Sequence, residues 1–275
     1  GKNQKGMGIS FDSSVSFDEV RNLIPIQSTY GGGATYPTAS GFNEFTQDGV
    51  SYLAPNYAKD GSWGPRFNPN TLVRHWDSWD PGSSNYKETR PWSAPKNSYD
   101  SFFDTGVTLM NTVALSGSNE NGSYRVSYSN LDQKGVMPGG ELQRNTVNIN
   151  TNYKLSERLK SNVALTYVKT EAQNRNVTGY NNANPLQGFT QWWQSQLDVE
   201  RLREQQNTSE GNQYTWNPVG ITTDANGVLQ SFNPTPNYFD NPSWNRDNML
   251  QEDIKNRVFG NANLSYDITD NLNIS

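Results

Sequence analysis

Apolar and polar residues alternate along several stretches of the chain. From Met7 to Phe17 the odd positions are Met, Ile, Phe, Ser, Val and Phe, and the even positions between them carry no apolar side chain. A helix would scatter these apolar residues around its circumference, whereas a strand places them all on one face. The alternation therefore predicts a strand over 7–17.

Four more complete strands follow the same rule, a sixth follows near the end of the chain, and a seventh begins after it. Their predicted apolar positions are Val107, Leu109, Val113 and Leu115; Tyr124, Val126 and Tyr128; Val147, Ile149, Tyr153 and Leu155; Leu159, Val163, Leu165 and Tyr167; and Val258, Ala262, Leu264, Tyr266 and Ile268. Alternation sustained over so many segments indicates an all-β protein with one apolar face.

Short and longer connections alternate between these strands. Polar turns are expected at 117–122, 156–158 and 269–271, and longer segments at 19–105, 132–142 and 170–256. In an up-and-down antiparallel sheet this places every tight turn at one end and every longer segment at the other. Outer-membrane barrels have this arrangement, with short periplasmic turns and long extracellular loops. The sequence thus favours an antiparallel, up-and-down transmembrane β-barrel over a soluble β-sandwich, whose strands and loops are shorter.

The two longest segments contain helix signals and all eight tryptophans. Asn184 followed by Pro185 predicts a helix start, and a second short helix is expected within 97–104. Six indoles are candidate ligand-binding residues, because an exposed indole offers a flat apolar face to a sugar ring or a peptide side chain. They are Trp63, Trp76, Trp79, Trp92, Trp192 and Trp193. The alternative is that these rings pack the long segments together.

Composition excludes several classes of protein. The chain has 275 residues, a net charge of −5 and no cysteine, and its mean hydropathy is −0.86 with a pI near 5.0. It has no apolar run near the ~20 residues of a transmembrane helix. The acidic charge argues against nucleic-acid binding. Without cysteine there is neither a disulfide framework nor a thiolate metal site.

No catalytic, metal or cofactor site is predicted. His75 is the only imidazole and is expected to lie on the surface, so a catalytic triad is not supported. The acidic pairs Asp77/Asp80 and Glu252/Asp253 are interpreted as solvated charges. Asp60-Gly61-Ser62 lacks the further oxygen ligands that a calcium site requires. Gly31-Gly32-Gly33 is not followed by Lys-Ser/Thr, so it is interpreted as a flexible loop and not as a phosphate-binding one. The protein is therefore not expected to be an enzyme.

Five motifs appear in the order typical of one protein family. They are Ser62-Trp63-Gly64-Pro65; Phe102-Phe103-Asp104-Thr105-Gly106-Val107-Thr108; Ser127-Tyr128-Ser129-Asn130-Leu131-Asp132-Gln133-Lys134-Gly135; Asn184-Pro185-Leu186-Gln187; and Arg257-Val258-Phe259-Gly260-Asn261. In these residues the chain resembles the SusC/RagA family of TonB-dependent outer-membrane transporters.

This resemblance implies an outer-membrane barrel of about 22 strands that imports oligosaccharides or peptides in a Gram-negative bacterium. It also implies a plug domain, a SusD-like surface lipoprotein as a lid, and energy from the TonB complex. Residues 1–275 are then expected to be the N-terminal portion of the barrel domain, a fragment without the plug and the later strands. We expect such an incomplete sheet to have two open edges.

The same interpretation predicts which side chains contact the lipid bilayer. The outward set is Phe11, Val15, Val147, Ile149, Leu165 and Leu264, with Tyr153 and Tyr266 at the periplasmic interface and Phe17 and Tyr167 at the outer one. The opposite strand face, with Arg125, Arg144, Asn148, Asn150, Asn152 and Lys154, would point into the lumen. Two alternative functions stay open at this stage: a barrel kept as a structural subunit of a larger assembly, and a secreted β-sandwich that binds glycans.

Overall fold

A computed structural model describes residues 6–21, 24–34 and 40–275. These residues form two compact units. The first, here called the sheet unit, contains the described residues of 1–19, 105–175 and 251–275. The second, here called the insert unit, contains those of 20–104 and 176–250. The chain thus leaves the sheet unit twice, and the two segments fold together.

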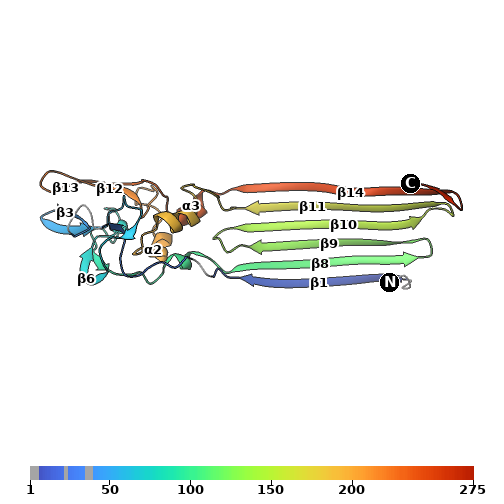
Figure 1. Ribbon diagram of the computed structural model, residues 1–275, viewed down its shortest axis with the longest axis horizontal. Helices are drawn as coiled ribbons and strands as arrows, with labels where there is room; N and C mark the ends of the chain where they lie inside the picture. Colours follow the sequence, from blue (N-terminus) through green and yellow to red (C-terminus); the bar gives the residue numbers. More distant parts are fainter. Residues whose placement is uncertain (1–5, 22–23, 35–39) are drawn as a thin grey trace. The chain divides into compact units, whose positions relative to one another are not determined.

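The sheet unit is one antiparallel sheet of seven strands in chain order (Figure 1). Its strands are β1 (Gly6–Asp18), β8 (Gly106–Asn119), β9 (Gly122–Lys134), β10 (Glu141–Lys154), β11 (Leu159–Gln173), β14 (Glu252–Thr269) and β15 (Leu272–Ile274). All the strands predicted from alternation are confirmed, and most extend several residues further. The antiparallel all-β architecture is therefore confirmed for this unit.

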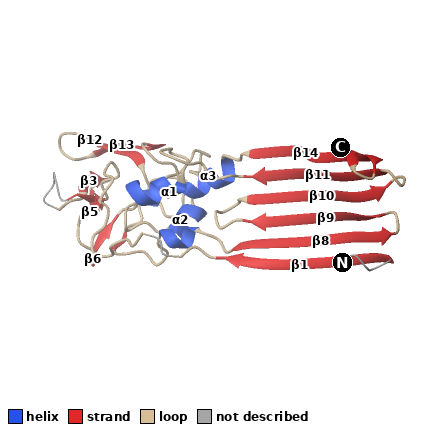
Figure 2. Cartoon of the chain, turned by 45° about the vertical axis from the view of Figure 1, so that its right-hand side comes forward, coloured by secondary structure: helices blue, strands red, loops and turns tan. Residues whose placement is uncertain are grey.

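The connections of the sheet unit divide between its two ends as predicted. At one end, tight turns join β8 to β9, β10 to β11 and β14 to β15, and Figure 2 shows these turns together. At the other end Asp18 pairs with Gly106 and Gln173 pairs with Glu252. Both long segments therefore leave and re-enter the sheet at the same end.

Strand pairing aligns the apolar residues on one face of the sheet. Phe11 pairs with Val113, which pairs with Tyr128, and this row continues through Val147, Tyr167 and Val258. The next row runs from Ile9 through Leu115, Val126, Ile149 and Leu165. Because paired residues point to the same side, these rows form a continuous surface, here called the apolar face.

The sheet is open. Within the described residues β1 pairs only with β8, and β15 pairs only with β14. The two open edges expected from the sequence are thus observed, whereas a closed barrel stays a prediction. None of the helices in the described ranges is long and apolar enough to cross a membrane.

The insert unit is a folded body with secondary structure of its own. It contains four two-stranded sheets, whose strands are β2 (Gly33–Ala34) with β5 (Ser62–Trp63), β3 (Asn43–Gln47) with β4 (Val50–Ala54), β6 (Asn68–Val73) with β7 (Arg90–Trp92), and β12 (Pro218–Thr223) with β13 (Leu229–Pro236). Its α-helices are α1 (Pro185–Gln187), α2 (Val199–Glu204) and α3 (Pro242–Asn248). Alternation did not predict these strands, because most of them are short and two of the four pairs contain register shifts.

The helix signals in the insert unit are largely confirmed. The Asn184 side chain accepts a hydrogen bond from the Leu186 amide and caps α1, which a π-helix (Gly188–Trp192) extends. The helix expected within 97–104 is a single 3₁₀ turn, Tyr99–Phe102. Asn241 caps α3 in the same way as Asn184 caps α1, through the amides of Ser243 and Trp244.

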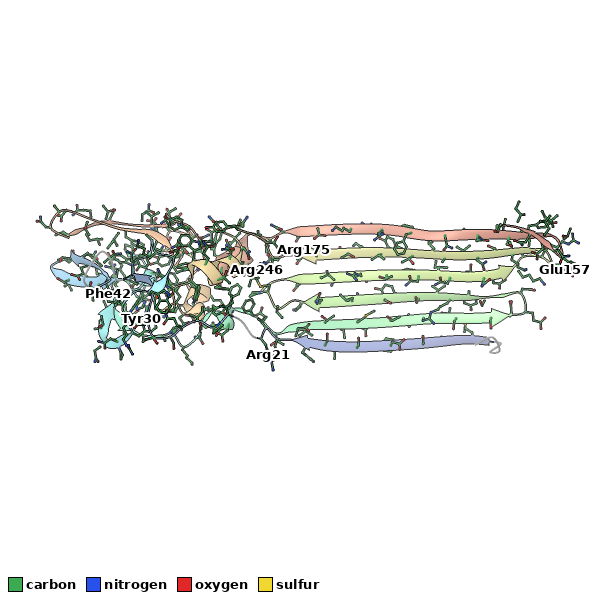
Figure 3. All side chains as sticks on the ribbon, viewed as in Figure 1. Arg21, Tyr30, Phe42, Glu157, Arg175 and Arg246 are labelled. Atoms are coloured by element: carbon green, nitrogen blue, oxygen red, sulfur yellow. The ribbon has the colours of Figure 1, made fainter. Side chains whose placement is uncertain are left out.

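Aromatic side chains form the core of the insert unit. Its side chains gather densely around Tyr30 and Phe42 in Figure 3, and Phe42 meets Trp92 edge to face at 5.0 Å. The fully or nearly fully buried rings include Phe45, Tyr57, Trp76, Trp79, Trp92, Phe102, Phe189, Trp193, Tyr214, Trp216 and Phe239. Burial of rings this large supplies the apolar area that orders two long segments.

Candidate functional site

The six candidate tryptophans occupy different environments in the insert unit. Four of them are at most 5% exposed: Trp76, Trp79, Trp92 and Trp193. These four indoles pack inside the unit, which is the alternative to ligand binding given above. Trp192 is partly buried and stacks on Tyr238 at 4.5 Å. Trp63 is 67% exposed, and it is the one candidate that offers an open indole face. The structure brings Trp79, but not the others, to the wall of the cavity described below.

Trp79 is held on both faces and at its ring nitrogen. The guanidinium carbon of Arg74 lies 3.9 Å from the ring centroid, and Phe232 stacks in parallel at 4.5 Å and 7°. The indole Nε1 donates to the Tyr57 hydroxyl at 3.1 Å. This ring therefore belongs to the framework of the site and has no face left for a ligand.

Arg74 joins β3 to the turn that carries Trp79. Its Nε and Nη2 both donate to the Ser78 carbonyl at 3.1 Å, and Nη1 donates to Gln47 Oε1 at 2.5 Å. Burial lowers the pKa of Arg74, and the neighbouring Tyr86 counteracts that shift. With several aromatic rings around it, the guanidinium is stabilised by cation–π contacts in place of water.

A cavity of about 400 Å³ opens beside this framework. Residues 79–82 and Tyr86 form one wall, from the first long segment, and residues 208–210, 229–232 and Pro234 contribute from the second. A volume of this size is in the range of small-molecule sites. Since neither segment encloses the space by itself, the cavity depends on the tertiary structure of the insert unit.

Asp80 is the fixed carboxylate of the cavity. Its Oδ1 accepts hydrogen bonds from the Gly82 amide at 3.0 Å and the Ser209 hydroxyl at 2.7 Å, and Oδ2 accepts from the Ser209 amide at 2.5 Å. Burial alone would raise the pKa of this carboxyl, but the bonds from Ser209 and Gly82 lower it below the ordinary value. Asp80 is thus an ionised acceptor with a set orientation, and the sequence Asp-Pro-Gly was a turn signal that could have indicated it.

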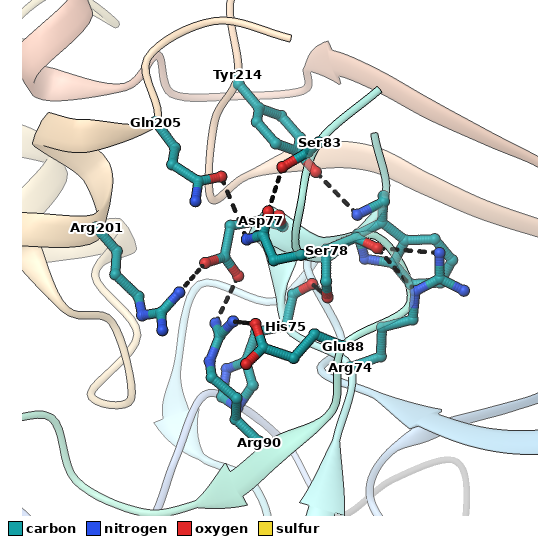
Figure 4. Close-up of polar contacts among 12 residues, drawn as sticks. Arg74, His75, Asp77, Ser78, Ser83, Glu88, Arg90, Arg201, Gln205 and Tyr214 are labelled. Carbon is teal, nitrogen blue, oxygen red and sulfur yellow. Dashed lines mark hydrogen bonds and ion pairs between the residues drawn. The ribbon is translucent and has the colours of Figure 1, made fainter. Parts of the chain in front are cut away.

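Asp77 is the centre of a buried ion-pair network (Figure 4). Arg90 Nη2 donates to Oδ1 at 2.5 Å and Arg201 Nη1 donates to Oδ2 at 2.7 Å. Burial acts to raise the pKa of Asp77, and the two arginines outweigh it and lower the pKa. Because Arg201 lies on α2, this carboxylate ties the second long segment to the first. The interpretation of Asp77 and Asp80 as solvated charges is therefore wrong, because both residues are buried and pair with side chains of the folded insert unit.

His75 is buried, so its predicted surface position is also wrong. The imidazole is 7% exposed and lies 6.0 Å from the Trp92 ring. Burial lowers its pKa to about 4, with the nearby Arg90 acting in the same direction. The ring is consequently neutral near pH 7. This neutral, enclosed imidazole packs against the Trp92 ring.

The three consecutive glycines, expected to be flexible, are buried, and the first two are tightly packed. A Cβ at Gly31 would lie 2.0 Å from the Trp92 ring, and one at Gly32 would lie 2.3 Å from the Gln194 side chain. Gly64 approaches as closely, since its Cβ would lie 2.2 Å from the Gly32 carbonyl oxygen. Gly64 thus lets two backbone segments come together, and Gly31 and Gly32 leave room for the side chains of Trp92 and Gln194.

The remaining acidic pair lies in the sheet unit. Glu252 accepts a hydrogen bond from Gln173 at 3.2 Å, and Asp253 forms an ion pair with Arg175. These groups are at the surface, as expected. Among the described residues, no group of three or more acidic or imidazole side chains could hold a metal ion.

Searches against protein-family models and curated proteins found no match to this chain.

Proposed function

We propose that the sheet unit is part of the wall of a SusC-like outer-membrane transporter, with the insert unit outside the bilayer. Such a transporter imports oligosaccharides or peptides, with a SusD-like surface lipoprotein as its lid and the TonB complex as its energy source. The proposal rests on the family motifs in the sequence and on the surface of the sheet described next.

The exposed apolar face is the observation that carries the proposal. Ile9 is 73% exposed, Phe11 is 67% exposed and Val258 is 66% exposed, and each lies in a row of apolar partners. Contiguous apolar surface of this extent is unfavourable in water at about 25 cal/mol per Å². A bilayer would cover it, as it covers the outer surface of known transmembrane barrels.

The apolar face ends in one row on three neighbouring strands, at Tyr128, Val147 and Tyr167. Beyond that row the same face of β11 carries Lys169, Glu171 and Gln173. Apolar side chains bordered by aromatic and then charged ones are typical of strands that cross a bilayer. The position of Tyr167 is therefore consistent with the predicted outer aromatic belt.

The opposite face suits an aqueous lumen. Thr112 and Ser129 share a hydrogen bond at 2.8 Å, and Thr166 donates to Asn148 at 2.8 Å. Arg125, Arg144, Asn150 and Asn152 belong to the same face by register. A soluble sandwich would instead need a second sheet against the apolar face, and the described residues of the sheet unit form one sheet only. This favours the membrane proposal over the glycan-binding sandwich.

Fractionation of the native cells tests the proposal. We expect the protein in the outer-membrane fraction after a carbonate wash, together with a surface lipoprotein that co-purifies in detergent. Deleting TonB should abolish growth on the imported substrate. Recovery in the medium or periplasm would rule out the transporter, and growth independent of TonB with the protein still in the membrane would favour the structural subunit.

A further inference from the structure

Basic side chains gather on the polar face of the sheet unit, which is the face opposite the apolar one. Arg144 of β10 pairs with Thr170 of β11, and Thr170 pairs with Lys255 of β14, so these side chains share one row. Arg257 is the next residue of β14 on the same face as Lys255. Arg144, Lys255 and Arg257 are all exposed, and they are here called the cationic cluster.

The spacing within the cationic cluster suits a ligand with several negative charges. Strands lie about 4.8 Å apart, so the backbone positions of Arg144 and Lys255, separated by β11, are roughly 10 Å apart. Those of Lys255 and Arg257 are about 7 Å apart along β14. A single small anion contacts one of these cations, whereas an extended ligand with two or more carboxylates reaches several of them at once.

Little of this positive charge is neutralised by the nearest carboxylate. Lys255 Nζ lies 3.7 Å from Asp253, and that carboxylate already forms an ion pair with Arg175. Within the described ranges, neither Arg144 nor Arg257 has a carboxylate partner. Cations that are exposed and not ion-paired remain available to a ligand.

The carboxylates of β1 are too distant to neutralise the cluster. Asp12 shares a row with Arg257, but that row crosses β8, β9, β10 and β11. The two residues are therefore roughly 24 Å apart along the sheet, beyond the Debye length of about 8 Å at physiological salt. Asp18 is likewise separated from Arg144 by β8 and β9. The cluster thus gives this part of the polar face a positive potential.

The position of the cluster along the strands relates it to substrate entry. It lies near the end of the sheet where both long segments leave, since β10 begins at Glu141 and β14 begins at Glu252. Under the proposed function the polar face lines the lumen and this end is extracellular. A substrate therefore meets the cluster as it enters the lumen.

We propose that the cationic cluster attracts and orients substrates that carry two or more carboxylates, and so determines which substrates enter. The carboxylates are those of an acidic oligosaccharide or an acidic peptide. Arg and Lys side chains lining a pore select anions in the same way, because a surface of one sign raises the local concentration of oppositely charged ligands. The inference deepens the proposed function, and it rests on that function for the direction of entry.

Titration calorimetry on the full-length protein, purified in detergent, tests the cluster. The anionic probes are trigalacturonate and triglutamate, and their neutral counterparts of equal length are maltotriose and trialanine. In about 20 mM NaCl, at least one anionic trimer should bind with a Kd of about 1 mM or tighter, and about tenfold more tightly than its neutral counterpart. In about 300 mM NaCl that binding should weaken at least about threefold, because salt screens exposed charges.

Removing the three charges together should remove the preference for anions. The triple variant Arg144→Gln, Lys255→Gln and Arg257→Gln should weaken binding of the anionic trimer about tenfold or more. The charge-conserving variant Arg144→Lys, Lys255→Arg and Arg257→Lys should stay within about threefold of the unmodified protein. If the first variant does not fold, Arg144→Gln alone should still weaken binding about threefold, since its side chain has no partner to lose among the described residues.

The matched control removes the same charge from the other end of the sheet. Lys154 ends β10, and Arg158 and Lys160 lie where β11 begins, so replacing all three by Gln should change binding less than about twofold. Circular dichroism checks that each variant folds. Absence of binding by both anionic trimers, no effect of salt, or an equal loss in the control would each overturn the proposal. An equal loss of affinity for neutral and anionic trimers would also overturn it, because the cluster would then pair with carboxylates of the protein itself. These measurements leave the fractionation outcome unaffected, so the two proposals fail separately.

Discussion

At the scale of single residues, His75 shows how burial alone changes the chemistry of a side chain. Its imidazole faces Arg90, Asp77 and Arg201, and burial lowers its pKa from 6.5 to about 4. The folded state therefore binds no proton in a pH range where the unfolded chain binds one. By linkage, the neutral ring leaves the free energy of unfolding undiminished above about pH 6.5. That free energy falls as pH falls toward about 4, because the unfolded chain then binds a proton that the folded state does not.

His75→Phe should remove this pH dependence, because phenylalanine keeps a ring against Trp92 but does not titrate. For the unmodified protein we expect a loss of about 3 kcal/mol between pH 6.5 and pH 4. All eight tryptophans lie in the insert unit, so urea titrations followed by fluorescence report on it. Burial raises the pKa of Asp240, so its effect on the free energy of unfolding near pH 4 has the opposite sign. Both proteins contain Asp240, so the difference between their pH dependences gives the contribution of His75. An unchanged slope in the variant would contradict the assignment.

Gly64 marks a second effect at the residue scale, the close approach of two backbones. Gly64→Ala should destabilise the insert unit by about 1–3 kcal/mol, because its Cβ would collide with the backbone of Gly32. Gly61→Ala is the control, since its Cβ would meet only an ordinary contact at 3.8 Å. Thermal unfolding followed by fluorescence measures both. Similar losses for the two variants would mean that the close approach is not the cause.

At the scale of elements, strand β10 combines two environments at adjacent positions. Ile149 lies in the apolar row with Val126 and Leu165, whereas Asn150 pairs with Arg125 and Ala164 on the other face. If the apolar face contacts lipid, the two positions should respond differently to the same charge.

Ile149→Lys should impair membrane assembly by roughly 2–4 kcal/mol, the cost of a lysine near the middle of a bilayer. Asn150→Lys should be mild, because its side chain would reach water in the lumen. The measurement is the folded fraction after refolding into lipid vesicles, scored by protease resistance over a urea series. Equal effects at Ile149 and Asn150 would refute the assigned faces.

At the scale of the whole molecule, different interactions stabilise the two units. The sheet unit is held by long antiparallel ladders and exposes its apolar face, whereas the insert unit encloses an aromatic core and the Asp77 ion pairs. Units that bury separate surfaces need not unfold together.

We therefore expect two separate transitions on chemical unfolding in detergent. Fluorescence should report loss of the insert unit at a lower urea concentration, and circular dichroism should report the sheet, which detergent covers, at a higher one. His75→Phe and Gly64→Ala should shift the first transition only. A single transition seen at the same midpoint by both probes would show that the two units unfold cooperatively.

The pattern of the sequence determined the sheet unit in advance. Alternation from Met7 to Phe17, and in the later strands, was enough to predict the strands, their chain order and the ends at which they connect. This worked because each strand puts every second side chain on the same face, a local property that needs no knowledge of distant residues. The Asn184 cap was predictable for the same reason.

Only the tertiary structure shows how the insert unit is folded and which of its side chains are buried. Most of its strands are too short for alternation to appear. The side chains that hold it together pair over long sequence separations: Asp77 with Arg201, Asp80 with Ser209, and Trp79 with Phe232. Whether a carboxylate is solvated or buried, and whether an indole is exposed like Trp63 or enclosed like Trp92, depends on which distant segment covers it. Residue type and local spacing do not contain that information, because burial and the resulting pKa shifts arise only when the two segments pack against each other.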